Sequence, residues 1–206
     1  MATSRYALSR QGSGIIIATV FGALWAAWAN PLFTRAPQAW FWVYALTVAA
    51  ISTVLLAAGI AVIRRGSRLP RETSNAIRRR IRRNYIMTVV AEIVALNIAA
   101  NLLITHHMMS YLPAAFAVIV GLHFFPLAWI FRMRHYHATA ALMTLAGTLA
   151  ILALVDGAPA DIPGSLAAAA CALVLWGSAA LSWWQAHNAI TDDATVPATL
   201  PATQAG

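Results

Sequence analysis

Two ionisable side chains, Glu92 and His123, are the clearest candidates for chemistry because each is set in a long apolar stretch. An ionisable group in lipid costs several kcal/mol, so it faces protein or water and commonly marks a proton or solute pathway. Glu92 is seven residues past Tyr85, and His123 is eight residues before Phe131. At about 1.5 Å per residue, both lie about 10 to 12 Å from the same membrane surface on consecutive antiparallel helices. We therefore predict that the two side chains touch.

Two amides, Asn97 and Asn101, lie on roughly the opposite helical face from Glu92. We expect a helix that is polar on two sides to lie at the centre of a bundle. Two interpretations of this intramembrane polar site remain open. The contact between Glu92 and His123 either fixes how two helices align, as buried polar pairs often do, or belongs to a proton-linked or solute-linked site.

A further cluster, His106-His107-Met108-Met109, carries imidazole and thioether groups that suit copper. Adjacent residues on one short loop do not easily converge on one ion, and ligand type without geometry is a weak argument. We therefore predict no metal and no cofactor, and keep this cluster as the one alternative metal candidate. The sequence also lacks a Gly-rich phosphate loop, a nucleophile elbow, paired carboxylates and a zincin helix, so we expect no enzyme.

All fourteen basic residues are arginines, and nine of them fall between Arg64 and Arg83. A net charge of +8 would suggest nucleic acid in a soluble protein. Here the charge is bounded by apolar stretches on both sides, which is typical of the positive-inside bias of membrane proteins. We therefore predict contact with anionic lipid headgroups and no nucleic acid. The candidate contact residues are Arg78, Arg79, Arg80, Arg82 and Arg83.

The elements that hold these residues must be membrane helices, since 61% of the 206 residues are hydrophobic and 10% are charged. A bilayer is spanned by about 20 apolar residues. The sequence predicts an all-α integral membrane bundle with one domain over residues 1–190 and a disordered cytoplasmic tail over 191–206. The arginines of the short loops place both termini in the cytoplasm. The six predicted spans are 14–30, 40–63, 85–105, 112–131, 136–155 and 164–184.

The first span has a second interpretation as a cleaved signal peptide. Arg5 and Arg10 precede an apolar core that ends in Ala27-Trp28-Ala29, which has the small-x-small form of a signal-peptidase site. The bulky Trp25 and Trp28 beside that site favour a retained helix.

Small residues recur every four positions in the second span, from Ala45 to Ala61, and in the third, from Ala91 to Ala99. Membrane helices associate through close packing of small residues. We expect both series to be contact seams within the bundle. A homo-oligomer interface is the alternative use of the same pattern.

The stretch from Tyr85 to Tyr136 contains Glu92 and then Gly121-Leu122-His123-Phe124-Phe125-Pro126-Leu127-Ala128. It resembles a family of small uncharacterised bacterial multi-pass inner-membrane proteins. The resemblance implies a bacterial inner-membrane location and no activity. We expect a membrane-embedded partner or scaffold, and the alternative is a permease-like, proton-coupled or ion-coupled protein that uses Glu92 and His123. An aqueous cavity that reaches Glu92 would favour the second.

Overall fold

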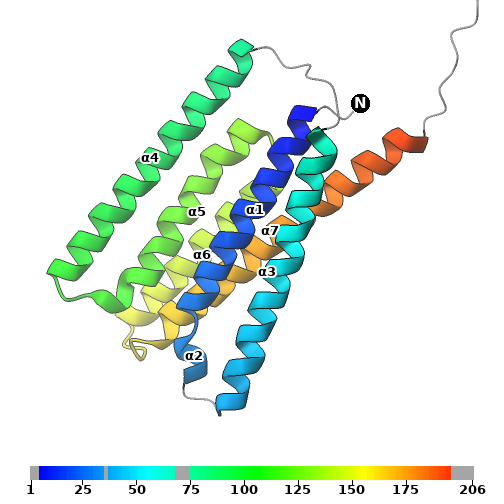
Figure 1. Cartoon of the computed structure of the whole chain (residues 1–206). Coiled ribbons are helices and arrows are strands. Elements are labelled where there is room, and N and C mark those ends of the chain that lie inside the picture. The colour runs from blue at the N-terminus through cyan, green and yellow to red at the C-terminus, as the bar shows by residue number, and fades with distance from the viewer. Residues whose placement is uncertain (1–4, 35–36, 68–74, 196–206) are drawn as a thin grey trace, which may run out of the picture.

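The described part of the chain consists of helices joined by short turns, and it contains no strand. A computed structural model describes residues 5–34, 37–67 and 75–195, and it contains seven α-helices and a short 3-10 turn, η1. Six of the helices are long and apolar enough to cross a membrane, which agrees with the predicted number of spans. Figure 1 shows them side by side and alternating in direction. The elements are α1 (Arg5–Trp28), α2 (Pro31–Thr34), α3 (Gln38–Ser67), α4 (Asn75–Thr105), η1 (Met109–Tyr111), α5 (Leu112–Phe131), α6 (His135–Val155) and α7 (Ile162–Thr195).

The helices α1, α4 and α7 run furthest beyond the spans predicted from hydropathy. The helix α4 begins at Asn75, so the arginines near its start are continuous with the helix that carries Glu92. The helix α7 ends at Thr195, past the predicted domain boundary at residue 190. The rest of the predicted tail, residues 196–206, lies outside the described residues.

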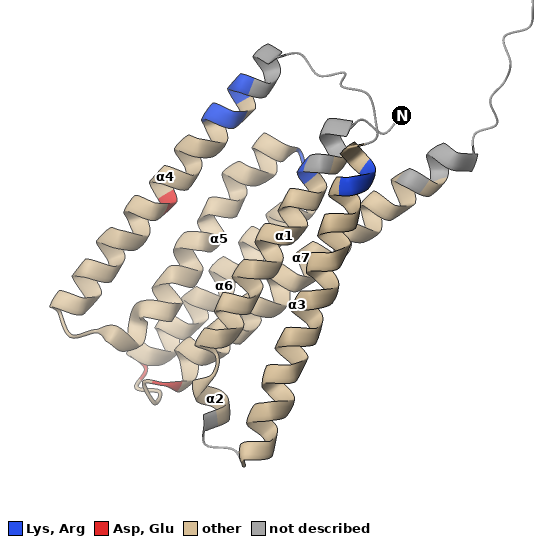
Figure 2. Cartoon of the chain, viewed as in Figure 1, with Lys and Arg blue, Asp and Glu red and all other residues tan. Residues whose placement is uncertain are grey.

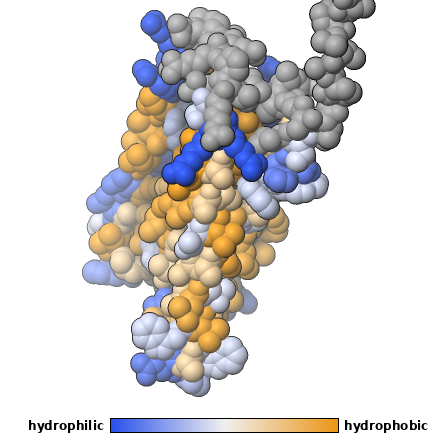
Figure 3. All heavy atoms as spheres, turned by 45° about the vertical axis from the view of Figure 1, so that its right-hand side comes forward, coloured by the Kyte–Doolittle hydropathy of each residue, from blue (hydrophilic) through white to orange (hydrophobic). Residues whose placement is uncertain are grey.

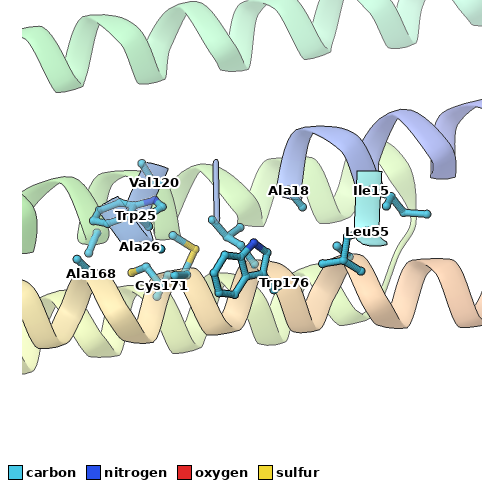
Figure 4. Close-up of a cluster of buried hydrophobic side chains, with 14 of the residues drawn as sticks. Ile15, Ala18, Trp25, Ala26, Leu55, Val120, Ala168, Cys171 and Trp176 are labelled. Atoms are coloured by element: carbon cyan, nitrogen blue, oxygen red, sulfur yellow. The ribbon is translucent and has the colours of Figure 1, made fainter. Parts of the chain in front are cut away.

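The helix α1 packs with one face against α3 and α7. Its buried side chains include Ile15 and Trp25, which join Cys171 and Trp176 of α7 in the largest apolar cluster. Figure 4 shows this cluster between α1, α3, α5 and α7. The indole of Trp176 also donates a hydrogen bond of 3.4 Å to the carbonyl of Thr19 on α1. The first predicted span therefore supplies part of the core.

The tightest helix contact joins α5 to α6 through two glycines. A Cβ added at Gly147 would lie 2.6 Å from the carbonyl oxygen of Ala114 and 2.8 Å from the backbone nitrogen of Val118. A Cβ added at Gly121 would lie 2.6 Å from the backbone nitrogen of Thr144. Both glycines therefore let two backbones approach as membrane helices with small residues do.

The predicted contact seam along α3 is wrong, because the alanine stripe faces away from the other helices. Ala49, Ala57 and Ala61 are exposed on the bundle surface. The buried face of α3 instead carries Leu55, Gly59, Val62 and Gly66. Alanine is apolar, so in a membrane helix its spacing does not distinguish a protein contact from a lipid contact. A homo-oligomer interface along the exposed stripe stays a prediction.

The charges of the described residues separate along the bundle. Figure 2 shows arginines where α4 begins and α3 ends, and acidic residues at the opposite end, in the connection between α6 and α7. We call the first of these the arginine end. Figure 3 shows that apolar residues predominate over the middle of the visible flank. This distribution is the one that a membrane protein needs along its axis.

The helix α4 stands at the edge of the bundle, so its predicted central position is wrong. It packs mainly against α5, and none of the residues in its apolar window is buried. The amides of Asn97 and Asn101 donate to their own helix, at the carbonyls of Ile93 and Asn97, over 2.8 Å each. Since these amides find acceptors within α4, they do not require a second neighbouring helix.

Candidate functional site

A cavity of about 550 Å³ lies between α1, α4 and α5. Drug-sized ligands occupy pockets of about 300 to 1,000 Å³. The helix α4 packs on α5, and α1 packs on α3 and α7, so α1 and α4 face each other without close packing. The cavity is the space between them. The walls are apolar and aromatic over most of their length, with Ile17, Phe21, Val89, Phe124 and Leu127 among them.

The spacing of the lining residues follows the helical period. On α4 the lining residues are Arg82, Tyr85, Val89 and Glu92, which fall on one face at intervals of three and four. This face points toward α5, while Val90 and Val94 are about half exposed on the other side of the helix. Because these residues share one face, α4 forms one wall of the cavity although it lies at the edge of the bundle.

Glu92 and His123 meet inside this cavity. The Oε2 atom of Glu92 lies 3.4 Å from the Nδ1 atom of His123, and the side chains are 14% and 8% exposed, respectively. The contact predicted from equal depth is therefore confirmed. The separation is that of an ion pair, and within the described part of the chain Nδ1 of His123 forms no hydrogen bond in this arrangement. A small rotation of either side chain would align the two atoms for a hydrogen bond.

A second link holds His123 to α4. The ring lies near enough to the backbone of Thr88, one turn before Glu92, to interact with it. In α5, Pro126 cannot donate its backbone nitrogen to the carbonyl of Leu122, which lies next to His123. The histidine thus joins two turns of α4 at a point where the α5 backbone is itself short of one hydrogen bond.

Two guanidinium groups line the cavity at the arginine end. Arg82 comes from α4, and Arg10 comes from α1. Arg10 donates a hydrogen bond of 2.9 Å to the carbonyl of Phe131 at the end of α5, and its guanidinium lies 5.4 Å from the centre of that ring. A cation is favourable at this position because the last carbonyls of a helix carry partial negative charge. Arg82 precedes Glu92 by ten residues, so the guanidinium-bearing residue and the acid are separated by about 15 Å along α4.

The other candidate residues do not join this site. Asn97 and Asn101 are exposed on α4 and are not among the residues that line the cavity. The residues His106, His107 and Met108 are exposed in the connection between α4 and η1, and Met109 is exposed at the start of η1. Within the described ranges, no group of three or more His, Cys, Asp or Glu residues could hold a metal ion.

The arginines proposed for lipid contact lie on the first turns of α4. Arg79, Arg80, Arg82 and Arg83 are exposed, whereas the side chain of Arg78 lies outside the described residues. Contact with anionic headgroups stays a prediction, which salt-sensitive binding to anionic vesicles would test.

The sequence interpretation missed the contribution of α1 to the site. Arg10 was considered only for topology and for the signal-peptide interpretation, although it lines the cavity and contacts Phe131. Tyr136 was also missed, and its hydroxyl lies against Gly14, where an added Cβ would be 2.8 Å away. The one available signal was the pair of glycines at 12 and 14, which permits close approach of another helix.

Comparison with known proteins gives one family match. Residues 85–179 match the family described as a family of unknown function (DUF7010). The matched region contains both Glu92 and His123 but not α1 or α3, and it covers less than half of the chain. This similarity agrees with the expected likeness to an uncharacterised family. No curated protein and no solved structure matches significantly.

Proposed function

We propose that this chain is a multi-pass bacterial inner-membrane protein without enzymatic activity, and that its cavity is the small-molecule site of a permease-like protein. The six long apolar helices support insertion. The separation of the arginines from the acidic residues in the connection between α6 and α7 supports an orientation with the arginine end and both termini in the cytoplasm.

The topology has a direct test in reporter fusions. Green fluorescent protein fused after Gly206 should fluoresce, because this reporter folds in the cytoplasm. Alkaline phosphatase fused after Gly157, in the connection between α6 and α7, should be active, because this enzyme needs the periplasm. Phosphatase activity after Gly206 together with fluorescence after Gly157 would reverse the proposed orientation.

One observation carries the functional proposal, which is that the cavity is lined by both Glu92 and His123. A pair that served only to align two helices would be enclosed by packed side chains. Here the two groups border about 550 Å³ of space. We therefore favour the permease-like function over a scaffold. A pair of groups that can bind and release a proton beside a cavity can couple proton transfer to the binding of a solute there.

Water access to this cavity can be measured with a matched pair of cysteines. In a Cys171→Ala background, Val89→Cys places a thiol on the cavity wall, and Val90→Cys places one on the opposite, exposed face of α4. A small charged methanethiosulfonate reagent, added to inside-out vesicles, should label Val89→Cys and leave Val90→Cys largely unlabelled. The reason is that a thiolate forms in water but not in lipid.

The contrary results are equally clear. Equal protection of both thiols would indicate a dry cavity and would favour the scaffold function. Equal labelling of both would indicate that α4 does not face lipid, and would contradict the proposed insertion of this helix. Labelling of Val89→Cys alone supports the permease-like site.

A further inference from the structure

We infer that the cavity between α1, α4 and α5 takes a single-chain amphiphile with an anionic head group. This inference rests on the proposed function, because it assigns a ligand class to the same cavity. The head group would lie beside Arg10 and Arg82, and the chain would extend along the apolar walls toward Glu92 and His123.

The charge balance of the lining favours an anion. Among the described residues that line the cavity, Arg10 and Arg82 are basic and Glu92 alone is acidic. Glu92 contacts His123, and a pair that shares one proton is neutral overall in either arrangement. The described lining therefore keeps a net positive charge at the arginine end, where an anionic group would be attracted.

The distribution of polarity favours an amphiphile over a small inorganic anion. Between the arginines and the Glu92–His123 pair the walls are formed by apolar and aromatic side chains such as Val89, Phe124 and Leu127. A hydrated anion would lose water along this stretch without gaining hydrogen bonds. An alkyl chain would instead gain from leaving water, and the stretch is about 15 Å long.

The depths of Arg82 and Glu92 along α4 match those of the head group and the chain of an amphiphile oriented in a membrane. Arg82 lies near the start of the apolar part of α4, where a head group meets water, and Glu92 lies deeper. A single chain enters a space of about 550 Å³ more readily than the two chains of a phospholipid. The space between α1 and α4 offers an approach from the same leaflet, since these helices do not pack closely.

A lipophilic cation is the competing ligand class. The rings of Phe21, Tyr85 and Phe124 line the cavity and could attract a cation, as could Glu92. Its positive group would, however, lie beside two guanidinium groups or would need to displace His123 from Glu92. The experiment must therefore compare both charges on one chain length.

The full chain in zwitterionic nanodiscs would be exposed to a photoactivatable palmitate, and crosslinked positions would be mapped by mass spectrometry. We expect crosslinks at cavity-lining residues of α1, α4 and α5. Unlabelled palmitate should compete better than hexadecanol or hexadecyltrimethylammonium, and phosphatidylglycerol in the nanodisc should not displace the probe. Arg82→Gln should raise the competing concentration about ten-fold, the size expected of one charged hydrogen bond.

Arg83→Gln is the matched control, because it removes the same charge from an exposed neighbour that does not line the cavity. Equal effects of Arg82→Gln and Arg83→Gln, stronger competition by the cation, or displacement by phosphatidylglycerol would each overturn the inference. Absence of crosslinks while Val89→Cys is labelled would also overturn it and leave the proposed function standing. Protection of Val89→Cys from the thiol reagent would instead contradict the proposed function itself.

Discussion

Replacing Gly147 with alanine should lower the free energy of unfolding by about 1 to 3 kcal/mol, the usual cost of overpacking a close contact. The added Cβ would meet backbone atoms of α5, at 2.6 Å from the Ala114 carbonyl and 2.8 Å from the Val118 nitrogen. Backbone cannot move aside as a flexible side chain can. The helices α5 and α6 must therefore separate, and thermal unfolding of the purified protein in mild detergent should begin at a lower temperature.

The matched control for this substitution is Gly177→Ala. Gly177 lies within α7, and nothing would come within 4 Å of a Cβ added there. Alanine favours a helix over glycine by about 0.5 to 1 kcal/mol, so Gly177→Ala should leave stability unchanged or raise it slightly. If Gly147→Ala and Gly177→Ala had the same effect, the close approach of α5 and α6 would be wrong.

The fold was largely predictable from hydropathy and charge, because both properties act along the helix axis. A run of about 20 apolar residues defines a span wherever its neighbours lie. The contact between Glu92 and His123 was predictable for the same reason, since it depends on depth. Depth follows from residue number at a fixed rise per residue.

The rotation and the neighbours of each helix were not predictable in this way. Alanine and valine can pack against protein or against lipid. The alanines of the exposed stripe on α3 were therefore predicted to be buried in a helix contact. Asn97 and Asn101 suggested a central helix, yet their amides bond to the α4 backbone. The role of Arg10 depended on α1 lying across from α4, which no property of a single helix encodes.

Removing Glu92 alone or His123 alone should lower the free energy of unfolding, and the two losses should add up to more than the loss in the double variant. The single variants Glu92→Leu and His123→Leu each leave a buried polar group without its partner, at a cost of about 1 to 3 kcal/mol. The double variant leaves neither group stranded. We therefore expect the two single effects to add to more than the double effect, with a coupling of about 0.5 to 3 kcal/mol between contacting residues.

The cycle would be measured on unfolding in detergent, with Glu92→Leu and Ser165→Ala as the control pair. The hydroxyl of Ser165 bonds to the carbonyl of Asp161 at the end of the bundle away from the arginines, so these two effects should add. Glu92→Gln adds a further distinction, because the amide can still bond to the ring of His123 but cannot exchange a proton with it. A Glu92→Gln variant as stable as the wild type would assign the pair to hydrogen bonding alone, and strictly additive effects in the main cycle would contradict the contact.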